Sequence, residues 1–384
     1  MRNKMKYLSI FFILIILCIV GMDLLDSSKE SKIKGNIEIA VNENLYEYLK
    51  ECADKFMEYN PKTNIQIKQI NSDKYVDNLK SQIEENELFN IGQLNRLDMK
   101  KLSLEDINID DDMNKVLETY SKNFSKNRLE QVIKDDKKIA IPLNSRPLVL
   151  YIREDILSQY GYHNYDISTW NDFVNIGTDI YKKSNGKLKI LNATGQDYED
   201  LVSLLVMQSL SKDKSIYDIQ QEVEDKLKEL KDNNILNLQD GNPFLARISS
   251  INGMRELMAL DEKCEWVAIN TPSKNIGTNR FFCAEGDNLI ILNQNNDNKK
   301  LIEKFITFVI TNNKYTIKYI KEGRFFSSYL YTYKNIEIED SIKNFNGKSP
   351  LIIMSNIEER APVIKKYDDY IDIKTKVLEE NNLR

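Results

Sequence analysis

The stretch NIEIAVNENLYEYLKECADKFMEYNPKTNIQIKQI, residues 36–70, predicts how the fold begins. Apolar and polar residues alternate over 37–41, which is typical of a β-strand. Apolar residues then recur at helical spacing over 45–56, and the Asn-Pro pair at 60–61 ends that helix. Alternation resumes over 65–67 as a second strand. The order therefore predicts a β-α-β unit.

The segments that follow continue the same alternation. Helical spacing predicts a helix over 75–83, and 88–94 favours a third strand that leads into a short helix near 99–102. Strands that alternate with helices favour a mainly parallel sheet covered on both faces. We expect an α/β fold.

The middle of the chain predicts a change to a second unit. Residues 132–139 indicate a hairpin that leads into an extended crossover through Pro142. Ser168 or Thr169 caps a helix that begins near Trp170, with Asp172 in its first turn. Later segments predict helices at 197–210, 220–231, 301–309 and 367–379, an extended apolar segment at 244–251, and strands at 266–269 and 288–292. A chain of 384 residues is long enough for two lobes with separate cores.

The N-terminus predicts export from the cytoplasm. Arg2, Lys4 and Lys6 precede an apolar run over 7–22, which indicates a targeting segment with its start in the cytoplasm. We assign 1–26 to a signal or anchor and 27–35 to a linker, so the rest is extracytoplasmic. An uncleaved anchor is favoured, with a lipoprotein signal at Cys18 or a cleaved peptide as the alternatives. The tether would hold the protein at the outer face of a bacterial membrane.

Composition argues against several function classes. The net charge of -5, from 54 Lys and Arg against 59 Asp and Glu, lacks the basic excess that nucleic-acid binding needs, so we expect no nucleic-acid partner. His163 is the single histidine and lies in a polar loop, which makes a Ser-His-Asp triad improbable. No phosphate-binding or dinucleotide-binding glycine motif is present. We expect no cofactor and no enzyme, although the sequence leaves a carboxylate pair for glycoside hydrolysis open.

The cysteines and acidic residues do not predict a metal site. Cys52, Cys264 and Cys283 have no C-x-x-C spacing, and we expect buried thiols, with a Cys264–Cys283 disulfide as the alternative. Residues 106–117 have part of the spacing of a calcium loop, but Asp111 and Leu117 occupy the positions that need Gly and Glu. An acidic, solvated connection is expected there.

Several short phrases occur in an order that is shared with a known family. They are FMEYNP (56–61), KKIAIPL with LYIRED (137–143 and 150–155), STWNDF (168–173), ING (251–253), the helix at 301–309, and the closing segment 361–377. In this order they resemble the extracellular solute-binding proteins, family 1, which include the maltose-binding protein.

The resemblance implies a periplasmic-binding-protein type II fold, with two lobes of mainly parallel sheets joined by hinge crossovers. Lobe 1 would comprise 36–144 and 266–322, and lobe 2 would comprise 145–265 and 323–384. A small solute would bind in the cleft between the lobes, which close around it. The implied partner is the membrane permease of an ABC transporter, and we expect a monomer.

Candidate ligand-binding residues lie at predicted strand ends and crossovers, because open α/β sheets bind ligands at the carboxyl ends of their strands. They are Asn42, Glu43, Asn44, Gln93, Asn95, Asn144, Arg146, Arg255, Glu285 and Asp287, with Tyr367 and Tyr370 of the last helix. Each has a structural alternative: Asn44 could cap the helix from Leu45, Arg146 could form a surface ion pair, and Asp287 could shape a turn.

Two departures from the family pattern bear on the solute. Met254-Arg255 follows the Asn-Gly pair where the family has a Trp, and Tyr367 or Tyr370 replaces a Trp near the last helix. Flat aromatic faces favour sugar binding, so a smaller or more polar ligand stays open. Trp170 and Trp266 are assigned to the core.

The predicted function is capture of a small solute, with a sugar as the first choice, and its delivery to an ABC-type importer. A membrane-anchored ectodomain that keeps the binding fold for sensing or regulation is the alternative.

Overall fold

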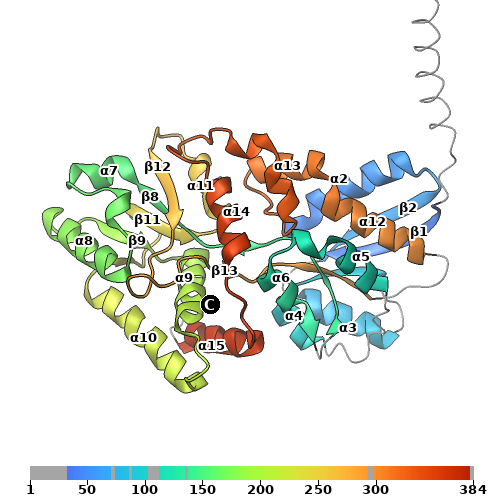
Figure 1. The fold of residues 1–384 in the computed structure, drawn as a ribbon, viewed down its shortest axis with the longest axis horizontal. Coiled ribbons are helices and arrows are strands. Elements are labelled where there is room, and N and C mark those ends of the chain that lie inside the picture. Colours follow the sequence, from blue (N-terminus) through green and yellow to red (C-terminus); the bar gives the residue numbers. More distant parts are fainter. Residues whose placement is uncertain are drawn as a thin grey trace, which may run out of the picture.

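The computed structural model describes residues 33–70, 74–85, 89–102, 112–134, 137–292 and 298–380. The predicted targeting segment, most of the linker and the core of the acidic connection lie outside these ranges. Two α/β units lie side by side along the long axis of the molecule (Figure 1). We call the unit that contains β1 the first lobe and the unit that contains β9 the second lobe. In the ranges described, no helix combines the length and apolarity needed to cross a membrane.

The first sheet confirms the predicted β-α-β unit. β1 pairs in parallel with both β2 and β3, and Ile37 and Ile39 of β1 are buried. β14 runs antiparallel to β3 and β6. The strand order is β2 (Thr63–Gln69), β1 (Gly35–Val41), β3 (Ile91–Leu94), β14 (Asn288–Ile291) and β6 (Ile141–Pro142).

Helices cover this sheet and form one continuous core with it. In α2, Leu49, Cys52 and Phe56 recur at helical spacing and are buried. The helix begins at Glu43, one residue after its cap Asn42, so the predicted cap at Asn44 is wrong. The helices of this lobe are α2 (Glu43–Tyr59), α3 (Tyr75–Glu85), α4 (Arg96–Lys101), α5 (Asp112–Tyr120), α6 (Lys126–Gln131), α12 (Lys299–Thr311) and α13 (Asn313–Lys321).

The second sheet is also mixed in direction. β9 is parallel to its neighbours β10 and β11, whereas β8 is antiparallel to β11 and β12. The α/β class with mainly parallel sheets is confirmed, since one strand in each sheet, β14 or β8, runs opposite to the other four. The strand order is β10 (Leu236–Asn237), β9 (Lys189–Asn192), β11 (Phe244–Ser249), β8 (Val149–Arg153) and β12 (Trp266–Asn270).

The helices of the second lobe include the predicted Trp170 start. Thr169 and Asp172 form a reciprocal capping box, and Trp170 and Trp266 are both buried, which confirms their assignment to the core. α15 packs against α9 and α10. These helices are α7 (Glu154–Gln159), α8 (Trp170–Lys183), α9 (Gly195–Ser209), α10 (Ile216–Asp232), α11 (Ile251–Met258) and α15 (Tyr367–Glu380).

Short strands carry the chain between the lobes. The predicted hairpin is β4 (Ile133–Lys134) with β5 (Lys137–Lys138), and β7 (Arg146–Pro147) pairs with β13 (Cys283–Ala284) at the crossover. The predicted return to lobe 1 at residue 266 is wrong, because β12 pairs with β8 in the second sheet. The return follows β12 and passes through β13. α14 (Pro350–Arg360) lies against β7 and β12.

The cysteines are buried thiols. Cys52, Cys264 and Cys283 are all free, so the alternative of a Cys264–Cys283 disulfide is wrong. Burial raises the pKa of the Cys52 thiol to about 12, which keeps it protonated. These side chains therefore act as small apolar core groups.

Candidate functional site

Predicted residues meet at the carboxyl edge of the first sheet. The backbone N–H of Asn42 donates to Gln93 Oε1 at 3.1 Å, which joins the ends of β1 and β3. Gln93 is buried, and its Nε2 has no hydrogen-bond partner among the described residues. A buried amide donor without a partner costs free energy unless a further group accepts from it. This edge therefore offers a donor for an additional ligand.

Two residues near the crossover form a hydrogen-bonded pair at the same edge of the sheet. Asn144 Nδ2 donates to Asp287 Oδ2 at 3.0 Å, and the backbone N–H of Asp287 donates back to Asn144 Oδ1 at 2.6 Å. Close packing next to this pair requires Gly286, where a Cβ would lie 2.1 Å from the carbonyl oxygen of Asn144. These two hydrogen bonds hold Asn144 and Asp287 together although they are far apart in sequence, and the turn role considered for Asp287 stays a prediction.

Asn95 positions a carboxylate that the sequence did not single out. Its side chain accepts from the backbone N–H of Asp98 at 2.9 Å and caps α4. Burial first, and then the nearby Asp287, raise the pKa of Asp98 to about 6. An acid in the first turn of a helix normally interacts with the helix N-terminus, so Asp98 carried no functional signal in the sequence.

Three predicted residues belong to a buried ionic cluster at the crossover, completed by Asp200 and Lys374. Arg146 of β7 pairs with Asp200 of α9, and Glu285, after β13, pairs with Lys374 of α15. Tyr370 donates to Glu285 Oε2 at 2.7 Å. The cluster carries two cations and two carboxylates, so its charges balance inside the protein. The surface ion pair considered for Arg146 is wrong, since Asp200 is buried.

The pKa values of the two carboxylates in this cluster are shifted in opposite directions. Burial alone would raise the pKa of Glu285, but Lys374 and Arg146 lower it to about 2. Burial raises the pKa of Asp200 to about 6 although Arg146 and Lys374 oppose it. The Glu285 carboxylate is therefore held ionised at neutral pH by its two cations.

The other predicted residues do not join these groups. Glu43 and Asn44 are exposed on the first turn of α2, and Arg255 is exposed on α11. Tyr367 is buried beside Tyr370, with the ring centroids 5.1 Å apart, and its hydroxyl has no partner among the described residues. A ligand-binding role for these four residues stays a prediction.

A polar recess lies at the carboxyl end of β9, next to a short connection between two strands. β10 and β11 flank β9 in parallel, yet only 238–243 connect them. Parallel strands are usually joined through a dozen or more residues that include a helix covering the sheet. Here the connection contains no helix, and Gly241 and Asn242 of it line the recess. The recess has a volume of about 360 Å³ and is lined by Asn192, Thr194, Gln196, Asp197, Gly241, Asn242, Phe244, Arg247 and Glu256.

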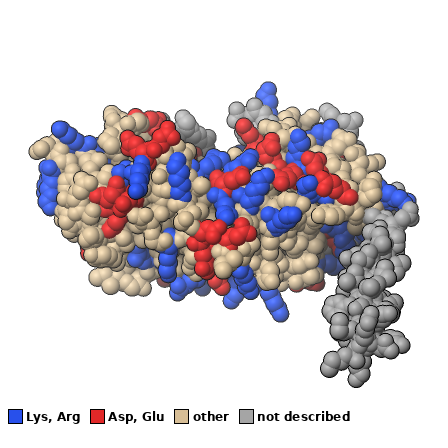
Figure 2. Space-filling model, turned by 90° about the horizontal axis from the view of Figure 1, so that it is seen from above, with Lys and Arg blue, Asp and Glu red and all other residues tan. Residues whose placement is uncertain are grey.

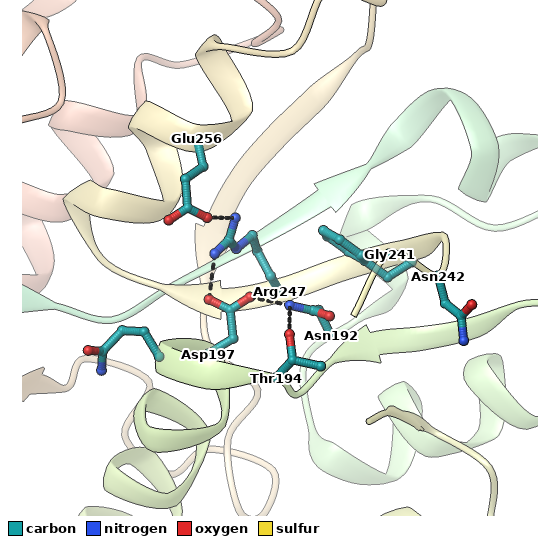
Figure 3. A pocket seen from close by; sticks show the side chains of 9 residues that line it. Asn192, Thr194, Asp197, Gly241, Asn242, Arg247 and Glu256 are labelled. Carbon is teal, nitrogen blue, oxygen red and sulfur yellow. Dashed lines mark hydrogen bonds and ion pairs between the residues drawn. The ribbon is translucent and has the colours of Figure 1, made fainter. Parts of the chain in front are cut away.

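Arg247 organises the recess (Figure 3). Its Nη2 lies 2.7 Å from Asp197 Oδ1 and its Nη1 lies 2.7 Å from Glu256 Oε2. Asn192 Nδ2 donates to Asp197 Oδ2 at 2.7 Å. Arg247 is 7% exposed, and its Nε has no partner among the described residues. The Nε is therefore a buried donor that no described group satisfies, beside a recess of about 360 Å³.

The recess combines donors, acceptors and one aromatic side chain. Thr194 begins α9 without a side-chain cap, so the first backbone N–H groups of the helix are not satisfied by that side chain. Glu256 supplies an exposed carboxylate, with its side chain 57% exposed. Phe244, which is partly buried, supplies an aromatic surface. Such a mixture suits hydroxyl groups, which both donate and accept.

The sequence could not have assembled this site. Arg247 was one charged residue inside the apolar strand FLARIS, and its partner Asp197 lies on a different element. A buried charge in a strand signals a partner but does not say which one. Among the described residues, no group of three or more His, Cys, Asp or Glu side chains is placed to hold a metal ion. His163 Nδ1 lies 2.9 Å from Glu154 Oε1 in its loop.

Comparison with known proteins agrees with this architecture. The family model for bacterial extracellular solute-binding proteins matches residues 40–314. The sugar-binding protein MalE from Xanthomonas citri is similar in structure, with a TM-score of 0.74, 14% identity and coverage of 90% of each chain. Maltose-bound MalE3 of T. maritima has a TM-score of 0.66 at 14% identity and covers 91% of this chain and 95% of its own.

A third structure has a different sugar in its name. The ABC substrate-binding protein of Listeria monocytogenes in complex with cycloalternan has a TM-score of 0.64 at 12% identity and covers 91% of this chain and 100% of its own. No curated protein sequence matches the chain. At these identities the structural likenesses show the fold, and the family match rests on the sequence itself.

Proposed function

Because this chain belongs to the bacterial extracellular solute-binding protein family, we propose that it captures a small hydroxylated solute, a sugar, between its lobes. It delivers this solute to the membrane permease of an ABC-type importer and catalyses no reaction. The protein works as a monomer at the outer face of the membrane, held by its N-terminal segment.

The observation that carries the proposal is the recess around Arg247. Its guanidinium is fixed by two carboxylates, and one of these, Glu256, exposes a charged acceptor in the recess. One cation and two carboxylates give the recess an excess of negative charge, which disfavours an anionic solute. A neutral solute with several hydroxyl groups satisfies both kinds of polar group.

The recess is lined by residues of the second lobe, and in this proposal the first lobe closes over it. Gln93 Nε2 at the end of β3 is a second buried donor without a partner in the described part of the chain. Asp200, three residues after Asp197 on α9, pairs with the crossover residue Arg146. The recess is therefore linked through one helical turn to the strands that join the lobes, which is where closure around a solute is sensed.

The experiment is thermal unfolding of the purified protein against mono- and oligosaccharides, amino acids, polyamines and phosphate esters. A solute at 100 times its dissociation constant adds about 2.7 kcal/mol to the free energy of unfolding. We expect a higher midpoint with one class of saccharide only. Shifts with amino acids or phosphate esters instead would refute the sugar assignment.

Substitutions in the recess test whether the solute binds there. Glu256→Gln keeps the shape of the recess and removes a charged acceptor, so the solute should bind at least tenfold more weakly. Glu229→Gln on α10 is the matched control, since Glu229 is also an exposed carboxylate paired with a cation but lies outside the recess. Equal affinity of both variants would remove the recess from the site.

A sensing ectodomain is the second candidate, favoured by the buried position of predicted ligand residues. Arg146, Glu285 and Tyr370 already satisfy one another inside the protein. Such a protein would pass its state to a membrane partner rather than release a solute. Absence of a thermal shift across the whole panel would favour this function.

A further inference from the structure

Two ion pairs join the lobes between α4 and α15, which lie side by side (Figure 1). Arg96 Nε lies 3.1 Å from Asp368 Oδ1, and Arg96 Nη2 lies 3.3 Å from Asp368 Oδ2, so this contact is bidentate. Lys100 Nζ lies 2.7 Å from Asp372 Oδ1. Both contacts cross from the first lobe to the second.

The spacing of the four residues makes the two helices complementary. Arg96 and Lys100 are four residues apart on α4, and Asp368 and Asp372 are four residues apart on α15. Residues at this spacing lie on one face of a helix. Each helix therefore presents a stripe of one sign to the other, and the two stripes are in register.

Apolar packing and a backbone hydrogen bond support the contact between α4 and α15. Leu97 of α4 packs against the core of the second lobe, although α4 belongs to the first. Arg96 also donates to the backbone carbonyl of Ile133 at 3.2 Å, and its side chain is only 13% exposed. The guanidinium is thus held in place before it meets Asp368, which lowers the entropy cost of the pair.

The lobes also touch through α13 and α11. Gly323 follows α13 with a φ of +70°, and a Cβ there would lie 2.7 Å from Arg255 Cβ. This contact joins the end of α13 in the first lobe to α11 in the second. This close backbone packing adds to a hydrophobic cluster that the first lobe shares with β8, α11 and β12 of the second.

We propose that the Arg96–Asp368 and Lys100–Asp372 pairs form a latch that holds the lobes closed without a solute. Opening separates two matched stripes of charge, so the open population rises when salt screens them. If the cleft binds a solute as proposed above, the latch regulates its entry. The closed resting state itself does not depend on that function.

The test measures the distance between the lobes in the full-length protein without any solute. Donor and acceptor dyes are attached to cysteines introduced by Tyr59→Cys in the first lobe and Tyr217→Cys in the second, because both tyrosines are exposed. Cys18→Ser removes one native thiol, and the three other cysteines are buried and do not compete for the dyes. Single-molecule energy transfer then reports the open and closed populations. In the parent protein, raising NaCl from about 0.1 to 1 M, which shortens the screening length from about 10 to 3 Å, should increase the open population several-fold.

Charge reversal identifies the pairs. Asp368→Lys with Asp372→Lys should raise the ratio of open to closed molecules more than tenfold, and adding Arg96→Asp with Lys100→Asp should restore it. Asp232→Lys is the control, because Asp232 pairs with Lys228 within α10. It should leave the ratio unchanged.

Three results would overturn the latch: an unchanged ratio after reversal, no restoration by the complementary changes, or no response of the parent protein to salt. If the reversed protein does not fold, the salt titration alone decides. No solute enters these measurements, so a failed solute screen leaves the latch standing, and a failed latch leaves solute binding standing.

Discussion

Replacing Lys374 by Met tests the buried ionic cluster at the crossover. Lys374 and Arg146 hold the pKa of Glu285 at about 2, against an ordinary value of 4.5 and against the effect of burial. A difference of about 2.5 pKa units corresponds to about 3 kcal/mol. Met keeps the apolar stem of Lys374 and removes its charge, so the cost comes from the carboxylate left behind. Breaking one side of a buried pair typically costs about 3 to 5 kcal/mol.

The pH dependence separates this cause from lost packing. In the parent protein, Glu285 has a lowered pKa, so its contribution is fully present above pH 4.5 and is lost as the pH falls toward 2. Without Lys374, burial dominates and the pKa of Glu285 moves upward. The difference in stability between parent and variant should therefore shrink as the pH falls from 7 toward 5, where the variant takes up a proton.

Urea unfolding, followed by the fluorescence of the buried Trp170 and Trp266, measures this difference at pH 7 and pH 5. Lys366→Met is the matched control: its side chain is 80% exposed and lies 3.7 Å from Asp369 on the same segment. An exposed pair contributes about 0 to 1 kcal/mol, so this control should be almost neutral. Glu285→Gln added to Lys374→Met should recover most of the stability. Lys374→Met as stable as Lys366→Met at pH 7 would refute the reasoning.

Three further predictions follow from the geometry. Asp98→Asn should raise the free energy of unfolding by up to about 3 kcal/mol at pH 7 and by little at pH 4. The pKa of Asp98 is raised to about 6, so the stability of the parent protein falls as the pH rises through that value and Asp98 becomes charged. Urea unfolding at both pH values measures the difference. Gly323→Ala should lower the free energy of unfolding by about 1 to 3 kcal/mol more than Gly347→Ala. Both glycines have a positive φ, but only a Cβ at Gly323 would meet a residue of the other lobe. Similar unfolding midpoints of the two variants would contradict this contact. Cys52, Cys264 and Cys283 should react with a thiol reagent only after unfolding, and rapid labelling in buffer would contradict their burial.

The sequence pattern correctly predicted those helices and strands whose signals lie within a few consecutive residues. The β1-α2-β2 unit and the Thr169 cap of α8 follow from alternation, helical spacing and a capping pair, all within a few residues. β9 was not predicted, because its four residues become a strand only by pairing with β10 and β11. The boundary at residue 266 failed for the same reason, since the pairing of β12 with β8 is a tertiary choice.

The candidate site shows the same limit. Placing residues at strand ends predicted Asn42, Gln93, Asn144 and Asp287, which the structure brings to one edge. The sequence did not predict that Arg247 would meet Asp197, because the two residues lie on different elements.

Surface charge is spread rather than concentrated on the face seen in Figure 2, where Lys and Arg lie among Asp and Glu. Paired charges such as Lys321 with Asp340 contribute to this mixture. Interspersed charge of both signs favours solubility and does not attract a polyanion.

The most direct test of solute capture is isothermal titration of the purified protein with maltose, malto-oligosaccharides and chito-oligosaccharides. The account predicts saturable binding of one saccharide class with a stoichiometry of one per chain, weakened at least tenfold by Glu256→Gln. No binding of any of these saccharides at millimolar concentration, while the protein is folded, would contradict it.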